Sequence, residues 1–196
     1  MPLTIRAHPS ALLEVDADVM AKAEGTVIAG PRAVVRLGRP KVLGARSRLV
    51  VTAGEGCEVA LAPRCFFNGL TIRVEGGGAV RIATECTFNG AELVAHDGPT
   101  LTVGRDCMFS SEIRVTTTDH HTIRDAATGE RINPPEDIVF GEHVWIGRGV
   151  QVLKGARIGD GSVIGARSLV TGEIPPGCLA VGVPARVVRT GIVWER

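Results

Sequence analysis

The sequence predicts a parallel β-helix, in which short strands wind into stacked triangular coils. The first observation is a six-residue repeat of apolar side chains without a gap, whose members are Phe140, Ile146, Val152, Ile158, Ile164 and Val170. Neither the helical period of 3.6 residues nor the strand period of 2 produces this spacing. Short flat strands joined by turns produce it, and three such units close one coil.

A second repeat, of 21 residues, extends the same fold toward the N-terminus. Cys65, Cys86 and Cys107 are 21 residues apart, and each is followed two positions later by a phenylalanine. We interpret these segments as coils with three extra residues at one corner and with the Cys and Phe side chains stacked inside. The chain has five cysteines, an odd number, and no C-x-x-C pair, which argues against a disulfide or zinc framework. Buried reduced thiols are expected.

Composition agrees with this fold and narrows the function. Hydrophobic residues make up 44% of the chain but aromatic residues only 4%, and there are 25 glycines, as expected for a narrow aliphatic interior with turn-rich corners. The net charge is +1 and no long basic run occurs, so we expect neither nucleic acid nor anionic lipid as partner. A small-molecule or saccharide partner is expected instead. No leader or membrane span is recognisable, which predicts a cytoplasmic protein.

Three segments are expected along the chain. Residues 1–34 form an N-terminal segment whose apolar residues fit either a short helix or an irregular first strand. The β-helix is expected over residues 35–183, where the six-residue positions begin at Leu37, Leu43 and Leu49. Residues 184–196 form a tail that caps the open end of the helix or reaches a neighbouring subunit.

One long interruption of the repeat stands out as the place for chemistry. Residues 116–137 are polar and follow no six-residue register, which predicts a loop extruded from the coils. The loop carries Asp119, His120 and His121, and a histidine is suited to take a proton from a hydroxyl near neutral pH. A solvated polar loop is the plain alternative. A three-histidine zinc site would have His143 as its only further candidate, because His96 lies in a corner, and the absence of an H-x-x-x-x-H spacing gives such a site poor support.

The C-terminal half carries motifs that resemble a known family. The stretch HVWIGRGVQVLKGARIGDGSVIGARSLVTGEIPPGCLAVGVPARVVR, together with the D-x-H-x-I arrangement of the loop, resembles the hexapeptide-repeat acetyltransferases. It is most similar to the capsular and exopolysaccharide O-acetyltransferases and to the galactoside and maltose acetyltransferases. The resemblance covers residues 107–194. It implies a left-handed β-helix, a homotrimer, acetyl-CoA as co-substrate without a metal, and active sites in clefts between subunits.

The resemblance also implies roles for individual residues. His121 matches the catalytic base and Asp119 the acid that orients it. Trp145 matches the tryptophan that borders the CoA groove. Other matches to the CoA site are Gly147, Arg148, Ala166 and Thr171 along the pantetheine arm, and Arg186 and Arg189 near the phosphates. Asn89 and Ser110 are candidates for contact with the acceptor, although a ladder of Asn68 and Asn89 explains the asparagine equally well.

The sequence thus favours an acetyl-CoA-dependent O-acetyltransferase. Its reaction would be direct transfer of the acetyl group to a hydroxyl of a sugar or polysaccharide precursor, with a histidine as general base. N-acetylation of an amino sugar would use the same histidine and is the first alternative. A non-catalytic or zinc-holding β-helix, of the γ-type carbonic anhydrase kind, is the second. The N-terminal hundred residues differ from the family's variable part, so the acceptor stays open.

Overall fold

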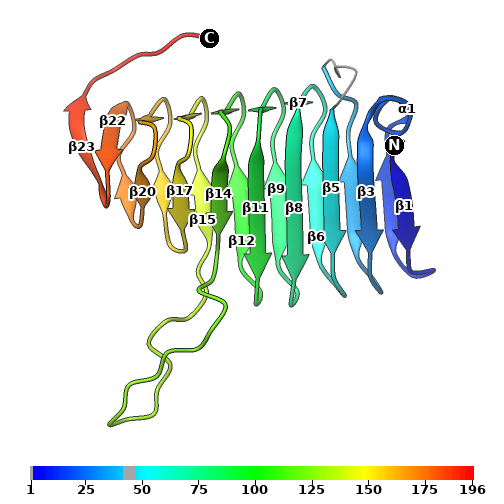
Figure 1. Cartoon of the computed structure of the whole chain (residues 1–196), viewed down its shortest axis with the longest axis horizontal. Helices are drawn as coiled ribbons and strands as arrows, with labels where there is room; N and C mark the ends of the chain where they lie inside the picture. The colour runs from blue at the N-terminus through cyan, green and yellow to red at the C-terminus, as the bar shows by residue number, and fades with distance from the viewer. Residues whose placement is uncertain (1, 42–46) are drawn as a thin grey trace.

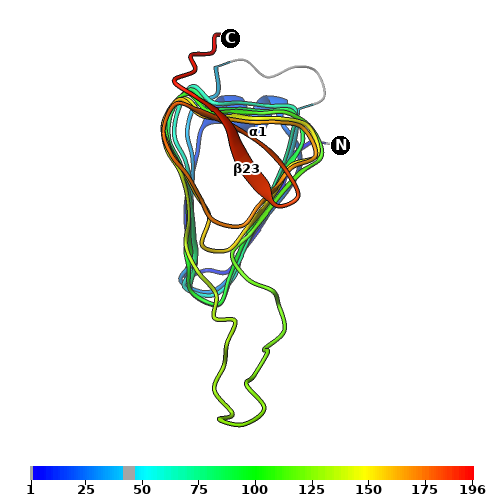
Figure 2. The same cartoon turned by 90° about the vertical axis from the view of Figure 1, so that its left-hand side faces the viewer.

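The predicted parallel β-helix is confirmed by the computed structural model, which describes residues 2–41 and 47–196 (Figure 1). Leu43, one of the six-residue positions, lies outside the described residues. Within the described part, strands stack into three sheets that form the sides of a triangular prism (Figure 2). We call the three sheets A, B and C in the order in which the chain passes through them. After sheet C the chain enters sheet A of the next coil.

Each full coil adds one strand to each sheet, and sheet C also includes the antiparallel β23. Sheet A contains β1 (Thr4–Ala7), β3 (Glu24–Ala29), β5 (Arg48–Ala53), β8 (Gly69–Glu75), β11 (Ala91–His96), β14 (Ile113–Thr116), β17 (Gln151–Leu153) and β20 (Leu169–Val170). Sheet B contains β2 (Leu12–Val15), β4 (Val34–Leu37), β6 (Glu58–Leu61), β9 (Ala79–Ile82), β12 (Thr100–Val103), β15 (Ile138–Phe140), β18 (Arg157–Ile158) and β21 (Glu173–Ile174). Sheet C contains β7 (Phe66–Phe67), β10 (Thr87–Phe88), β13 (Met108–Phe109), β16 (Trp145–Ile146), β19 (Val163–Ile164), β22 (Cys178–Gly182) and β23 (Ala185–Thr190).

The repeated apolar residues fill the interior, as the six-residue period predicts. The six repeat positions from Phe140 to Val170 are all at most 2% exposed. The Cys and Phe ladders are also inside, with Cys65, Cys86 and Cys107 free, buried and donating from Sγ to backbone carbonyls of the following coil. The neighbouring thiol of Cys86, and then burial, raises the pKa of Cys65 and Cys107. These cysteines therefore belong to the core.

The extra residues of the longer coils widen one sheet. Leu70 pairs with Ala91, 21 residues later, whereas Val152 pairs with Val170, 18 residues later. The expected corner bulge is replaced by longer strands of sheet A, because β8 has seven residues and β17 only three. A strand extension keeps the backbone ladder paired, which a bulge would interrupt. The prism is consequently wider at its N-terminal end, as Figure 2 shows.

The coils begin well before residue 35. Strands β1 and β2 pair with β3 and β4, so the described residues from 2 to 34 are part of the stack. The helix α1 (Ala17–Lys22) follows, with the Asp16 carboxylate capping it by accepting from the Asp18 N–H at 2.9 Å. The sequence left this segment open between helix and strand, and the structure contains both.

At the C-terminal end, the chain turns back on itself. Strand β23 pairs antiparallel with β22, and residues 191–196 then run back along the stack (Figure 1).

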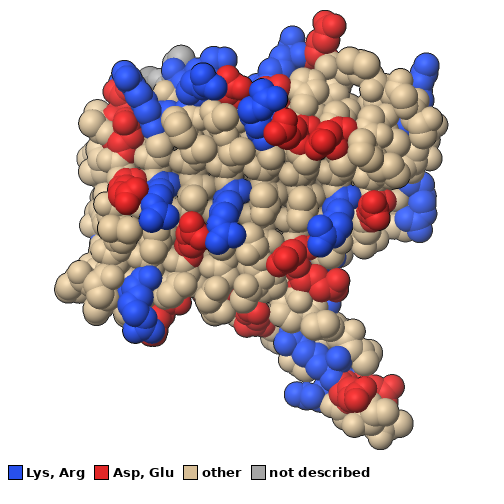
Figure 3. Space-filling view, turned by 180° about the vertical axis from the view of Figure 1, so that it is seen from behind, with Lys and Arg blue, Asp and Glu red and all other residues tan. Residues whose placement is uncertain are grey.

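Charges on the long sides of the prism are largely paired between coils. Glu58 contacts both Arg36 at 3.6 Å and Arg81 at 2.5 Å, and Figure 3 shows basic and acidic residues interleaved on one face. In the part of the chain that the structure describes, no helix has the length and apolarity needed to cross a membrane.

Candidate functional site

The long interruption of the repeat projects from the corner between sheets A and B. It leaves the coils after β14 and returns at β15, and it extends away from the prism (Figures 1 and 2). Both of its ends are fixed at the neck. The Glu136 N–H donates to the Thr117 carbonyl at 3.1 Å, and the fully buried Thr117 hydroxyl accepts from the His96 N–H at 3.1 Å. The neck therefore has a defined position relative to the coils.

A buried amide holds the histidine segment in place. The Asn133 side chain is only 7% exposed and makes three hydrogen bonds. Its Nδ2 donates to the Asp119 carboxylate at 2.9 Å and to the His121 carbonyl at 2.8 Å, and its Oδ1 accepts from the Ile123 N–H at 2.6 Å. One side chain thus fixes the backbone on both sides of Thr122.

The Asp119 carboxylate points toward the coils. Its Oδ2 lies 2.7 Å from Nζ of Lys154, which sits on the next turn between sheets A and B and also donates to the Pro134 carbonyl at 3.0 Å. The Asp119 carboxylate contacts Lys154 and Asn133 in the described structure. The backbone carbonyl of Asp119 accepts a hydrogen bond from the His121 N–H at 2.8 Å. In the protomer Asp119 therefore positions His121 through the backbone and Asn133.

His121 and His120 differ in their surroundings. The His121 side chain is exposed, on a backbone held by Asn133. His120 has a positive φ of 63°, its N–H donates to the Thr118 hydroxyl at 3.1 Å, and its ring centre lies 6.0 Å from that of His96. The backbones of both histidines are held by hydrogen bonds, and among the contacts of the described residues only His120 has a ring partner.

Lys154, and after it Asn133, lowers the pKa of Asp119 below its ordinary value. A carboxyl with a lowered pKa stabilises the folded state above its unfolded pKa, and this stabilisation is lost as the pH falls through the folded pKa. We therefore expect the loop neck to stay closed at neutral and mildly acidic pH and to open only below about pH 4.

The amide resonance of Ile123, which reports the bond to Asn133, provides the measurement. Its NMR chemical shift is expected to stay constant down to about pH 4, and Lys154→Met should move the transition to higher pH because the cause of the lowered pKa is gone. Lys22→Met, on α1, is the matched control and should have no effect. A transition that Lys154→Met leaves in place would contradict this account.

A second set of predicted residues lies along the corner between sheets C and A. Asn89, Ser110 and Gly147 follow one another in successive coils: the Asn89 N–H donates to Phe109 at 3.0 Å and the Ser110 N–H to Ile146 at 3.0 Å. A Cβ at position 147 would lie 2.8 Å from the backbone nitrogen of Ala166, so only glycine fits there. Arg148 at this corner pairs with Glu112, which lowers the pKa of Glu112 and raises that of Arg148.

The remaining predicted residues lie elsewhere. Trp145 is 38% exposed on the outer side of sheet C and lines a pocket of about 470 Å³ together with Arg189 of β23. Arg186, also on β23, donates to the adjacent Ala185 carbonyl at 3.0 Å. Thr171 follows β20 and thus lies at the corner between sheets A and B, where Lys154 also lies. The predicted CoA residues are therefore divided between two corners and one face.

A single protomer does not bring His121 and Trp145 together. The loop leaves the corner between sheets A and B, which is opposite sheet C in the triangle (Figure 2). Ser110 and Thr117 lie at opposite ends of the four-residue strand β14, which spans about 13 Å at 3.3 Å per residue.

Sequence reasoning missed the residues that fix the loop. Asn133 precedes Pro134-Pro135 within a polar stretch, and Lys154 is one of only three lysines in the chain. The scarcity of lysine among the 22 Lys and Arg residues was the signal in the sequence that could have singled out Lys154. His143 lies at the corner between sheets B and C, away from the loop histidines. Among residues 2–41 and 47–196, no three His, Cys, Asp or Glu side chains gather as a metal-binding group.

Comparisons with known proteins agree with this architecture. Residues 137–172 match the family model for bacterial transferase hexapeptide (six repeats). The chain is 38% identical over 85 residues to the polysialic acid O-acetyltransferase of Escherichia coli O1:K1, covering 43% of this chain and 28% of the relative. It is 50% identical over 70 residues to the galactoside O-acetyltransferase of E. coli K12, covering 36% of this chain and 32% of the relative. The chain thus spans about a third or less of the length of these two relatives.

Solved structures of polysialic acid acetyltransferases match almost the whole chain. The polysialic acid O-acetyltransferase OatWY superposes with a TM-score of 0.79 and 28% identity, covering 99% of this chain and 88% of that chain. The stacked six-residue repeats define this chain as a hexapeptide-repeat β-helix protein. In its repeats and its fold it is similar to the hexapeptide-repeat acetyltransferases.

Proposed function

We propose that this protein is an acetyl-CoA-dependent O-acetyltransferase that acts on a hydroxyl of a sugar or polysaccharide precursor. The observation that carries the proposal is the exposed His121, whose backbone is fixed at the neck of a loop projecting from a rigid scaffold. The fold shared with OatWY over 99% of the chain supports the same assignment. His121 is the general base of the proposed reaction.

The chemistry follows from the properties of the imidazole. A neutral ring nitrogen of His121 takes the proton from the acceptor hydroxyl while the oxygen attacks the thioester carbonyl of acetyl-CoA, which supplies the acetyl group. The C–O bond forms, the C–S bond breaks, and the thiolate leaves. Such a base contributes about 10² to 10⁴ in rate, and positioning of the two substrates contributes the rest.

The proposed site is assembled between protomers of a homotrimer. The loop of one protomer carries His121, and the corner between sheets C and A of its neighbour carries Asn89, Ser110 and Gly147. Two observations support this arrangement. A protomer alone separates the two halves, and the loop exposes Ile123 and Ile132 at 53% and 60%, as expected of a segment that a neighbour covers.

A thiol-release assay with acetyl-CoA tests the reaction and the class of acceptor. The acceptors are neutral galactosides, maltose, oligosialic acid and amino sugars. Release of CoA with formation of an alkali-labile ester is the expected result. An alkali-stable amide formed only with amino sugars would establish N-acetylation instead. Lack of CoA binding together with bound zinc would replace the proposal by the zinc-holding β-helix.

A further inference from the structure

The segment after β23 is bound to the side of the stack. The Ile192 N–H donates to the Gly177 carbonyl at 3.0 Å, and Trp194 is only 8% exposed although its neighbour Val193 is 89% exposed. Residues 191–196, hereafter the tail, therefore place one indole against the coils and leave the adjacent side chain in solvent. This contrast indicates that Trp194 is held by specific contacts.

His143 provides those contacts. The two rings stack with centres 4.0 Å apart and planes 9° from parallel. The Trp194 indole N–H donates to the His143 carbonyl at 2.9 Å, and Nε2 of His143 lies 3.1 Å from the Trp194 carbonyl, which can only accept. Stacking and two reciprocal hydrogen bonds thus fix both the side chain and the backbone of Trp194.

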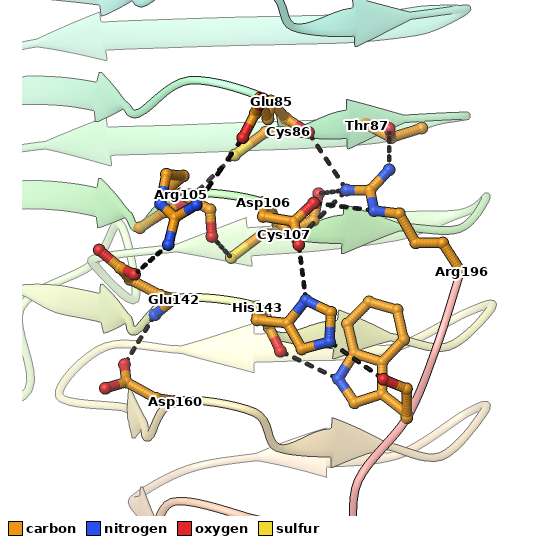
Figure 4. Close-up of polar contacts among 12 residues, drawn as sticks. Glu85, Cys86, Thr87, Arg105, Asp106, Cys107, Glu142, His143, Asp160 and Arg196 are labelled. Carbon is orange, nitrogen blue, oxygen red and sulfur yellow. Dashed lines mark hydrogen bonds and ion pairs between the residues drawn. The ribbon is translucent and has the colours of Figure 1, made fainter.

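Arg196 and Asp106 complete the attachment (Figure 4). The Asp106 carboxylate lies 2.6 Å from Nδ1 of His143 and 2.9 Å from Nε of Arg196, so it joins the tail to the ring that stacks on Trp194. The Arg196 guanidinium also donates to the Thr87 hydroxyl at 2.8 Å and to the carbonyls of Glu85, Asp106 and Cys107 at 3.1–3.2 Å. A planar guanidinium can make this set of bonds, whereas an ammonium group cannot reproduce its geometry.

The turns beneath the tail carry side chains at an unfavourable backbone position. Asp106 and His143 have φ values of 60° and 53°, and the equivalent positions of the next two coils are Gly161 and Gly177. The equivalence follows from the turn hydrogen bonds, which each of these residues donates to the preceding coil. A left-handed backbone disfavours residues other than glycine. Arg64 and Glu85 in the preceding coils also have this conformation, with φ values of 64° and 68°, and of these four side chains those of Asp106 and His143 contact the tail.

The tail also forms one side of the pocket beside Trp145. The pocket of about 470 Å³ is lined by both tryptophans, by Arg189 and by aliphatic residues of sheet C and the tail. The ring centres of Trp145 and Trp194 are 5.9 Å apart. Among the described residues that line it, Arg189 is the charged one and no carboxylate is present. Aromatic walls with one cation suit a ligand that combines an apolar arm with phosphate groups.

We propose that the tail is a wall of the acetyl-donor pocket, and that His143, Asp106 and Arg196 are positioning residues that hold Trp194 in this wall. The inference rests on the proposed function, because it takes coenzyme A thioesters as the ligand. Trp194 contacts the donor and forms one side of the pocket that Trp145 and Arg189 also line. Detaching the tail removes Trp194 from the pocket and weakens donor binding, while the acceptor and the base His121 are untouched.

The experiment measures coenzyme A binding by calorimetry and the KM values for acetyl-CoA and acceptor in tail variants of the full chain. Trp194→Ala and Arg196→Met should each raise the Kd for coenzyme A about tenfold, equivalent to about 1.4 kcal/mol. The KM for the acceptor should not change. Trp194→Phe should recover most of the affinity, and Arg196→Lys should recover little. Glu195→Gln, on the exposed side of the same tail, is the matched control and should bind coenzyme A like the unaltered protein.

Fluorescence gives a second reading, because Trp145 and Trp194 are the only tryptophans of the chain. In a Trp145→Phe background the emission of Trp194 should shift to longer wavelength when Arg196→Met is added, since the indole becomes exposed. If the unaltered protein does not bind coenzyme A, the proposed function itself fails. If it binds and the tail variants bind equally well, only the tail proposal is overturned. Should Trp194→Ala fail to fold, the two Arg196 variants decide by the same criterion.

Discussion

Replacing His121 with alanine is expected to lower kcat for acetyl transfer by about 10² to 10⁴, the contribution of a general base. The Kd for coenzyme A and the oligomeric state should stay unchanged, because the His121 side chain is exposed and the loop is held through its backbone and Asn133. Steady-state kinetics in the thiol-release assay, with calorimetric binding of coenzyme A, provides the measurement.

His120→Ala is the matched control. It removes an adjacent imidazole from the same loop, but one whose ring lies 6.0 Å from His96. We expect kcat to change less than about threefold in this variant, as for an exposed substitution outside the reacting groups. Equal losses in both variants would show that the loop, rather than one base, is what the reaction requires. Unchanged turnover in His121→Ala would remove this residue from the mechanism.

Six-residue spacing was sufficient to predict the fold class and the identity of most core residues. The reason is physical: each coil places equivalent residues one above another, so Ile146 and Val152 repeat the environment of their neighbours. The first coils could not be predicted in the same way. The pairs Thr4 with Thr26 and Glu24 with Arg48 are 22 and 24 residues apart, and unequal coil lengths leave no constant period to detect.

The site was predictable by residue type and only partly by position. His121 could be singled out because the loop interrupts a regular repeat. The role of Asn133 could not, because it depends on how residues 119 to 133 fold back, which no period describes. The contact between Trp194 and His143 joins residues 51 positions apart across a chain reversal at β23. Such a contact follows from the tertiary arrangement rather than from local sequence.

The second large effect is expected at the phenylalanine ladder. Phe109 is fully buried, with its ring centre 4.7 Å from that of Phe88 and 5.2 Å from that of Phe140. Phe109→Ala should lower the free energy of unfolding by about 3–5 kcal/mol, because it removes a large side chain and leaves a cavity that neighbouring coils cannot close. Urea unfolding followed by circular dichroism at fixed protein concentration measures this loss.

Phe66→Ala tests whether burial or simple loss of a phenylalanine is responsible. Phe66 lies on β7 beside the fully buried Phe67, and its own side chain is only partly buried. Replacing Phe66 with alanine should lower the free energy of unfolding by about 1 kcal/mol.

The cooperativity of unfolding provides a second test of the ladder. Each coil contacts only its neighbours, so the stability of a solenoid is a sum of interface terms. Weakening the coil that joins the wide N-terminal stack to the narrow C-terminal one should therefore also lower the urea m-value in Phe109→Ala, as the two parts begin to unfold separately. Equal losses at both positions, with unchanged m-values, would contradict a core organised as a ladder.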